Sequence, residues 1–282
     1  MKYYIVDVFA ENKYKGNPLC VFFCDKSLKQ EEMQQIAFEI HFSEVIFIID
    51  SSGKDYFDAR IFTPDVELPF AGHPILGAAY AITQEYRLSS KIILRIKDKT
   101  VTTYIQNSRV TLYHDYYCPG PCFEKSYIAR IISLSTECVD PFYPVQLISS
   151  GLPAIAIPLL NLEALEHCAV NHDLYSAHIK QYGKANLFPF LWNDECIRAR
   201  CFMDDPGYLE DPATGSANIA LAHYLVQYKY PHERQLNRYR VIQGKEMGRE
   251  SIIDMEIRNR NNENLIGMTG NIIVLADGEW KF

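Results

Sequence analysis

One carboxylate, Glu44, stands in an otherwise largely apolar part of the sequence. It lies in the segment 41–49, where the five apolar residues that follow it indicate a buried strand. A carboxyl group at the entry of such a strand is expected to be partly desolvated, which raises its pKa and lets it keep a proton near neutral pH. A general acid or base needs that property. The structural alternative is a solvent-facing residue on an amphipathic strand.

Two glycine-containing turns each precede an apolar helical stretch. The first contains Gly72 and His73, and the second contains Gly215 and Ser216. The amino terminus of a helix presents unpaired backbone N–H groups and a partial positive charge, so it favours anions. Glycine there lets a ligand approach the backbone closely. The two turns therefore predict a binding site for a small carboxylate, with ordinary capped helices as the alternative.

Asp211 comes shortly before the second of these helices. Its carboxylate could orient His73 across a cleft between two halves of the protein, or it could hydrogen-bond the substrate. It could equally close the loop, as Asp residues often do. The sequence contains no phosphate-binding loop, dinucleotide fingerprint or His-Glu-x-x-His motif. We therefore expect acid/base chemistry by side chains alone, without a cofactor.

The elements that must position these residues repeat within the chain. Residues 59–62 (Ala-Arg-Ile-Phe) recur as residues 199–202 (Ala-Arg-Cys-Phe), and each copy is followed by an acidic, proline-containing loop and then by a glycine turn. A second pair of matching segments, 16–21 and 151–156, occurs in the same order. Together these matches predict a duplication.

The predicted fold class is α+β, with two pseudo-symmetric halves that are each a mixed, barrel-like β-sheet wrapped around a central helix. We expect an N-terminal half over 1–118, a proline-rich linker region over 119–144 and a C-terminal half over 145–282. The last strand of the chain is a candidate to complete the N-terminal half.

Local patterns indicate individual elements. Ser27 is the expected N-cap of a first helix, with Gln30 completing a capping box, and Pro74 suits the first turn of the first central helix. Strands are expected at 92–96, 101–105 and 110–113 in the first half and at 239–243, 252–257 and 272–275 in the second.

Composition narrows the possible partners. The formal net charge of −7 argues against nucleic acid, and no leader or membrane span is recognisable. We therefore expect a cytoplasmic protein that binds neither nucleic acid nor a membrane.

Cysteine usage bears on metal binding. The eight cysteines form no Cys-x-x-Cys pair and are expected to be reduced thiols. His114, Cys118 and Cys122 could supply three metal ligands, but the prolines between the cysteines and the lack of a fourth ligand favour a turn. We expect no metal.

These motifs resemble the PhzF-like family of phenazine-biosynthesis isomerases, which shares its fold with diaminopimelate epimerase. Residues 6–9 with 16–18 look like the family's opening, Ser43 and Glu44 like its catalytic carboxylate segment, and 72–74 with Gly77 like its first helix entry. The most specific stretch is 210–217. The resemblance runs nearly end to end.

The resemblance implies a cofactor-independent, homodimeric isomerase that moves a proton within a small carboxylate-bearing substrate, in a site between the two halves. Glu44 would be the general acid/base, and His73 and Asp211 would assist it. Gly72, Gly215 and Ser216 would bind the substrate. The identity of the substrate stays open, because residues 45, 74 and 75 depart from the family's pattern.

An amino-acid racemase or epimerase and a non-catalytic binding protein on the same scaffold are the alternatives. The related epimerases use two cysteine thiols, at positions that align with Ala71 and Thr214 here. Neither side chain can act as a base, which disfavours two-thiol racemisation. An exposed cysteine of low pKa at the site would favour it.

Overall fold

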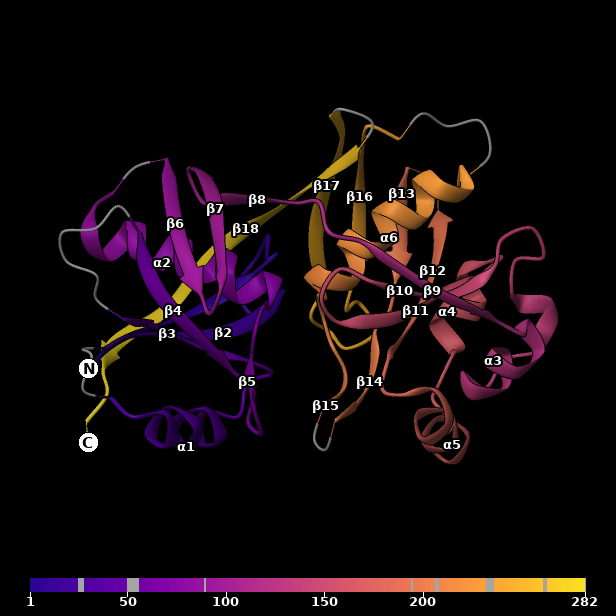
Figure 1. Cartoon of the computed structure of the whole chain (residues 1–282), viewed down its shortest axis with the longest axis horizontal. Helices are drawn as coiled ribbons and strands as arrows, with labels where there is room; N and C mark the ends of the chain where they lie inside the picture. Colours follow the sequence, from indigo (N-terminus) through magenta and orange to yellow (C-terminus); the bar gives the residue numbers. More distant parts are fainter. Residues whose placement is uncertain are drawn as a thin grey trace. The chain divides into compact units, whose positions relative to one another are not determined.

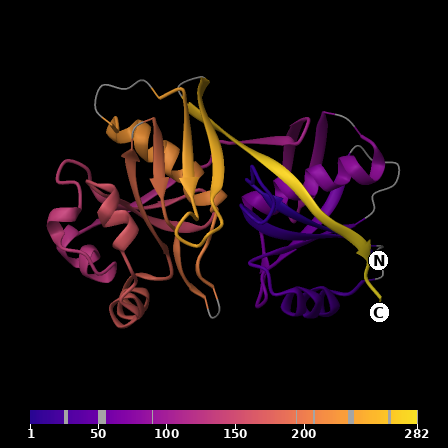
Figure 2. The same ribbon diagram turned by 180° about the vertical axis from the view of Figure 1, so that it is seen from behind.

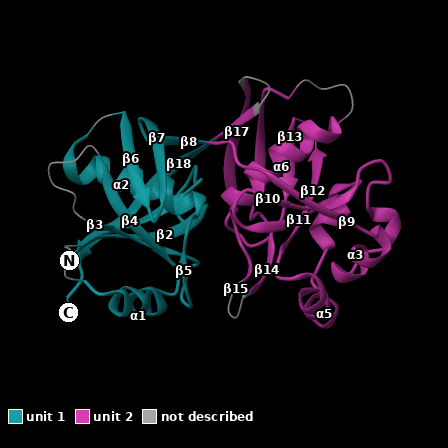
Figure 3. Ribbon diagram, in the orientation of Figure 1, with its two compact units in different colours: residues 1–113, 268–282 teal, residues 114–267 magenta. Residues whose placement is uncertain are grey.

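The chain divides into two compact units. The computed structural model describes residues 1–24, 28–49, 56–88, 90–193, 195–205, 208–231, 236–260 and 263–281 (Figure 1). Unit 1 comprises Met1–Tyr113 and Met268–Phe282, and unit 2 comprises His114–Gly267 (Figure 3). Figure 2 shows the last strand, in yellow, returning from unit 2 to unit 1.

Unit 1 is a barrel around a buried helix. Its elements are β1 (Lys2–Val8), β2 (Asn17–Cys24), α1 (Gln30–Ile40), β3 (Val45–Ile49), β4 (Phe57–Phe62), β5 (Glu67–Leu68), α2 (Gly72–Tyr86), β6 (Lys91–Ile96), β7 (Lys99–Gln106), β8 (Arg109–His114) and most of β18 (Glu263–Glu279). Strand pairing runs β1-β2-β3-β4-β6-β7-β8-β18 and returns to β1, which closes an eight-stranded barrel. The pairs β2–β3 and β4–β6 are parallel.

The central helix of this barrel, α2, is buried from Gly72 through Thr83 except at Tyr80. Small residues make that possible, because a helix enclosed by strands has room for few large side chains. At Gly77 an added Cβ would lie 3.0 Å from Val8 Cγ2 and would overlap Leu19. The apolar, alanine-rich sequence of α2 therefore matches its place inside the barrel.

Unit 2 repeats this order of strands. Its elements are β9 (Cys118–Phe123), α3 (Lys125–Ile131), a 3-10 turn (Thr136–Cys138), β10 (Val145–Ser149), β11 (Pro153–Pro158), α4 (Leu162–His167), α5 (His172–Tyr182), β12 (Asn186–Asn193), β13 (Cys196–Ala199), β14 (Phe202–Asp205), β15 (Tyr208–Glu210), α6 (Gly215–Tyr228), β16 (Arg238–Gln243) and β17 (Ser251–Arg260). The pairs β11–β12 and β13–β16 are parallel, and β10–β11, β12–β13 and β16–β17 are antiparallel. This is the order found in unit 1 from β1 to β7, and α6 takes the place of α2. The predicted α+β fold with two similar halves is confirmed.

The segment 119–144, expected as a linker, is folded into unit 2. It contains most of β9 and all of α3, and Ile128, Ile131 and Ile132 are fully buried in a core cluster that also holds Tyr175. These three isoleucines have helical spacing. The prolines that suggested a linker lie outside α3, where they do not interrupt it.

Two smaller expectations also differ from the structure. Helix α1 begins at Gln30, so Gln30 does not complete a capping box; instead Glu32 Oε2 accepts a hydrogen bond from the Lys29 N–H (2.9 Å). Ser27 lies outside the described residues. The strand expected at 272–275 in the second half belongs to unit 1, where it pairs with β1. Among the described residues, no helix combines the length and apolar character needed to cross a membrane.

Candidate active site

Glu44 is positioned by the connection between α1 and β3. Helix α1 ends at Ile40, and His41 adopts a left-handed backbone conformation (φ 56°) that turns the chain. Ser43 and Glu44 then lead directly into β3. Because β3 is parallel to β2, the entries of both strands lie at the same end of the barrel, and β2 begins with Asn17.

His73 meets Glu44 from the amino terminus of α2. The His73 Nε2 atom lies 3.5 Å from Glu44 Oε2, and the two side chains are 5% and 16% exposed. On the other side of the ring, His73 Nδ1 lies 3.4 Å from Asn17 Nδ2, and the Ser43 hydroxyl donates to Asn17 Oδ1 (3.4 Å). Unit 1 thus brings together Glu44 and His73, two of the candidate site residues, and adds Asn17.

The His73 ring is neutral. Burial lowers its pKa from 6.5 to about 3, so its contact with Glu44 is not an ion pair at neutral pH. An amide nitrogen can only donate a hydrogen bond, so His73 Nδ1 is the acceptor in its contact with Asn17 Nδ2. The proton of the neutral ring is therefore on Nε2. Within the described residues, that buried Nε2 makes no hydrogen bond. Buried polar atoms are rarely left so, which suggests that a ligand completes this position.

A neutral buried histidine should make the protein sensitive to acid. The unfolded chain takes up this proton near pH 6.5 and the folded chain only near pH 3. The contribution of the neutral His73 ring to the free energy of unfolding is therefore fully present above about pH 6.5, and it is lost as the pH falls toward 3. One such group changes stability by about 1.4 kcal/mol per pH unit in that window.

Between about pH 6.5 and about pH 5 the free energy of unfolding should fall in the wild type. We expect this fall to be smaller by about 2 kcal/mol in His73→Gln. Urea unfolding across this pH range measures the change. The buried His178 and His223, whose pKa values are also lowered by burial, should leave a residual slope of the same sign. Equal slopes in the variant and the wild type would show that His73 is not the group responsible.

In unit 2 a buried polar cluster surrounds Asp211. The Thr214 hydroxyl donates to Asp211 Oδ2 (2.6 Å), and Gln243 Nε2 donates to the Asp211 carbonyl (2.8 Å) and to Thr214 Oγ1 (3.0 Å). Asp211 and Thr214 are each 7% exposed, and Gln243 is fully buried. The predicted contact between Asp211 and His73 joins residues of different units and stays a prediction.

The predicted substrate-binding residues lie at the starts of the two central helices. Gly72 is the first residue of α2, and Gly215 and Ser216 are the first two residues of α6. The Ser150 hydroxyl donates to the Ser216 carbonyl (2.7 Å), which fixes the first turn of α6. Both helices have an extended residue and no side-chain hydrogen bond at the N-cap. Their first N–H groups therefore receive no side-chain cap from these residues, which suits an anion.

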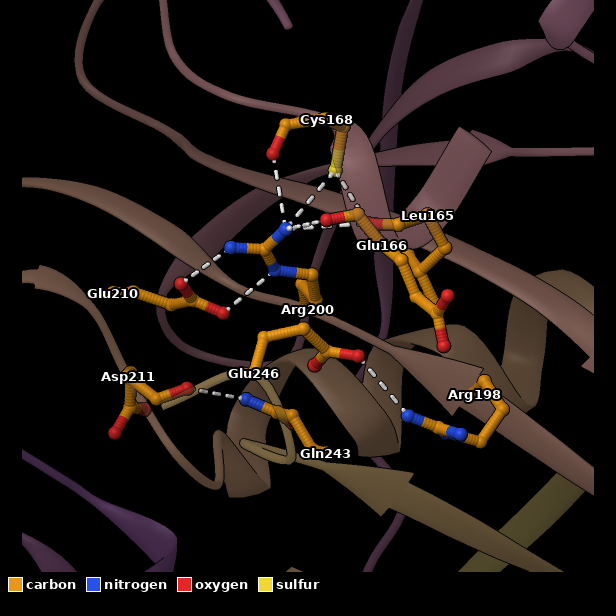
Figure 4. A network of polar contacts seen from close by, with 9 residues as sticks. All are labelled: Leu165, Glu166, Cys168, Arg198, Arg200, Glu210, Asp211, Gln243 and Glu246. Carbon is orange, nitrogen blue, oxygen red and sulfur yellow. Dashed lines mark hydrogen bonds and ion pairs between the residues drawn. The ribbon is translucent and has the colours of Figure 1, made fainter. Parts of the chain in front are cut away.

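An arginine–glutamate pair holds the strand that leads to Asp211. The Arg200 guanidinium binds both carboxylate oxygens of Glu210 (2.9 and 2.8 Å), and its Nη1 donates to the carbonyl oxygens of Leu165, Glu166 and Cys168 at the end of α4 (Figure 4). In unit 1 the equivalent residue, Arg60, binds both carboxylate oxygens of Glu67 (2.9 and 2.7 Å). The repeat seen in the sequence therefore extends to its ion pairs.

Sequence reasoning missed three residues of these clusters. Asn17 lies in the opening segment 16–18 but has no role in the sequence-based prediction, and Thr214 enters it only as the replacement for a thiol. Gln243 gave no signal, because it is the last residue of a strand, 29 positions after Thr214. Among the described residues, no group of three or more His, Cys, Asp or Glu side chains could hold a metal ion. Cys118 and Cys122 are exposed on β9.

Known proteins are similar to this chain over most or nearly all of its length. A family model described as phenazine biosynthesis-like protein matches residues 6–278. The uncharacterized isomerase YddE of Escherichia coli O157:H7 is 29% identical over 295 residues, which cover 98% of this chain and 97% of that protein. Trans-2,3-dihydro-3-hydroxyanthranilate isomerase of Pseudomonas aeruginosa is 29% identical over 253 residues, or 89% and 88% of the two chains.

Solved structures show the same fold. A phenazine biosynthesis protein of the PhzF family from Bacillus anthracis matches with a TM-score of 0.87 at 21% identity, covering 100% of this chain and 99% of that one. A predicted epimerase from Pseudomonas aeruginosa matches with a TM-score of 0.83 at 30% identity, covering 99% and 98%.

Proposed function

Because this chain belongs to the phenazine biosynthesis-like protein family and is an isomerase, we propose that it moves a proton within a small carboxylate-bearing substrate, with Glu44 as general acid and base. The observation that carries the proposal is the Glu44 carboxylate 3.5 Å from a neutral, buried His73 whose Nε2 makes no hydrogen bond within the described residues. A carboxyl group and a ring N–H side by side can exchange a proton with a substrate and hold one of its polar groups.

The reaction needs only one proton carrier. The Glu44 carboxylate takes a proton from a carbon next to a double bond of the substrate, and the electrons of the broken C–H bond form a new double bond to the neighbouring carbon. The electrons of the old double bond then form a C–H bond at its far carbon, where the protonated Glu44 returns the proton. His73 does not compete for this proton, because a pKa of about 3 makes its ring a weak base. Its Nε2–H is available to hydrogen-bond Glu44 or the substrate.

The thiol chemistry of a racemase has less support. The two positions that would carry the thiols hold Ala71 and Thr214, which are the N-caps of α2 and α6. Burial raises the pKa of Cys20 and of Cys168 to about 12 and also raises that of Cys201. These three thiols therefore stay protonated near neutral pH and are poor bases.

The substrate carboxylate is proposed to bind at the helix starts that hold Gly72, Gly215 and Ser216. We expect Gly215→Val to weaken binding at least about tenfold, because a branched side chain blocks close approach to the backbone N–H groups. Calorimetry with 3-hydroxyanthranilate, an aromatic carboxylate that cannot isomerise, measures the affinity. Unchanged affinity in the folded variant would place the carboxylate elsewhere.

An NMR screen in heavy water tests the proposed reaction. The chelator-treated protein is incubated with trans-2,3-dihydro-3-hydroxyanthranilate, the compound in the relative's name, and with a panel of small unsaturated carboxylates. One compound should convert to an isomer and take up deuterium at a single carbon. Conversion that leaves every carbon-bound hydrogen in place would contradict the proton transfer.

The homodimer stays a prediction that sedimentation can check.

A further inference from the structure

We propose that Thr214 is a positioning residue for the reaction, and that Gln243 orients its hydroxyl so that it holds the Asp211 carboxylate in place. The inference rests on the proposed role of Asp211 in the isomerase site. It adds two residues of unit 2 to that site, and both act through Asp211.

The first observation is that Thr214 does not use its hydroxyl for the helix it begins. Thr214 is the N-cap of α6, a position where a Thr side chain commonly accepts a hydrogen bond from the second or third helical N–H. Here the side chain makes no such bond and instead donates to Asp211 Oδ2 at 2.6 Å. The hydroxyl therefore binds the carboxylate and does not cap the helix.

The second observation is that Gln243 fixes the direction of this hydrogen bond. Gln243, the last residue of β16, donates a hydrogen bond from Nε2 to Thr214 Oγ1 (3.0 Å), so the hydroxyl oxygen is the acceptor in this contact. A hydroxyl has one hydrogen, which leaves that hydrogen for Asp211. Gln243 Oε1 in turn accepts from the Thr214 N–H (3.2 Å) and from Asn218 Nδ2 (3.1 Å), which fixes the orientation of the amide.

The loop has little freedom to rearrange. Gln243 and Asn218 are fully buried. The next residue, Gly244, has a φ of +73°, and an added Cβ there would lie 2.7 Å from the Pro212 carbonyl oxygen, so the end of β16 touches the loop directly. The Asp211 N–H donates a hydrogen bond to the carbonyl oxygen of Cys201, the residue after Arg200 (2.9 Å). This bond holds the start of the loop. Figure 4 shows Gln243 directed at Asp211.

Two neighbouring titratable groups of unit 2 bear on the Asp211 carboxylate: the Cys201 thiol and the Glu210 carboxylate. The Cys201 thiol interacts electrostatically with Asp211, and burial keeps this thiol neutral near pH 7. The neighbouring Glu210 is paired with Arg200. In unit 1 the equivalent N-cap is Ala71, which has no hydroxyl, so this arrangement belongs to unit 2 alone.

The test compares Thr214→Val, which removes the hydroxyl at nearly constant volume, with Thr214→Ser, which keeps it. Loss of a hydrogen bond to the ionised carboxylate should raise the pKa of Asp211 by about one unit, and Thr214→Ser should restore the wild-type value. The readout is carbon-13 NMR titration of the Asp211 carboxyl, assigned by its loss in Asp211→Asn. Should Thr214→Val not fold, Thr214→Ala carries the same expectation.

Thr103→Val is the matched control, because Thr103 is a fully buried threonine in unit 1 whose hydroxyl donates to the Ile92 carbonyl (3.0 Å). It should leave the Asp211 titration unchanged. With an active substrate, the pH profile of kcat/KM should move to higher pH in Thr214→Val by the same amount and return in Thr214→Ser.

An Asp211 titration that is the same in Thr214→Val and the wild type would overturn the inference, as would a Thr214→Ser variant that behaves like Thr214→Val. The titration does not depend on turnover. The inference and the proposed function can therefore fail separately: an inactive protein with the expected shift would refute only the function.

Discussion

Glu44→Gln is expected to lower kcat at least about a hundredfold and to leave the affinity for the substrate nearly unchanged. The amide has the shape of the carboxyl group and can still contact His73, but it cannot take up a proton and return it. Because the substitution removes a step of the reaction and keeps the contacts, the loss should fall on kcat rather than on binding. Steady-state kinetics and calorimetry on the same preparation separate the two effects.

A matched control is Glu39→Gln, which makes the same substitution at an exposed position on α1. It should keep full activity, whereas Glu44→Asp should keep only part, because its carboxyl group is withdrawn by one methylene. Full activity of Glu44→Gln would assign the proton to another group.

Arg200→Met should destabilise the protein by about 3–5 kcal/mol, the usual cost of breaking a buried ion pair by removing one partner. The Arg200 and Glu210 side chains are only 11% and 14% exposed. The substitution leaves the Glu210 carboxylate without its bidentate partner and takes the Arg200 Nη1 donor away from three carbonyl oxygens. Urea unfolding measures the loss.

The control is Arg240→Met, which breaks the pair with Asp254 on the surface of unit 2. These side chains are 51% and 27% exposed, so the loss should stay below about 1 kcal/mol. Similar losses at the two arginines would mean that burial of the Arg200 pair adds nothing to its contribution.

The sequence predicted the duplicated fold, and it singled out Glu44 and His73 as candidate site residues. Three local patterns led to them: the recurring Ala-Arg-x-Phe segments, the apolar strand after Glu44 and the glycine turn at the start of α2. That His73 assists Glu44 was implied only by the family resemblance. The structure shows what the two repeated arginines have in common: Arg60 and Arg200 each form an ion pair with the glutamate that precedes a central helix.

What the sequence did not predict depends on contacts between distant parts of the chain. Gln243 meets Thr214 because β16 lies beside β13 and ends against the loop at Pro212. The strand at 272–275 joins unit 1 because it pairs with β1, at the opposite end of the sequence. In the segment 119–144, the prolines masked the helical spacing of the isoleucines in α3.

A crystal structure of Glu44→Gln with its bound, unreacted substrate would test the assignment of the proton carrier most directly. The account predicts that the side chain at position 44 lies within about 3.5 Å of the carbon that takes up deuterium, with the His73 ring beside it. A complex in which that carbon lies beside another titratable side chain and far from position 44 would contradict it.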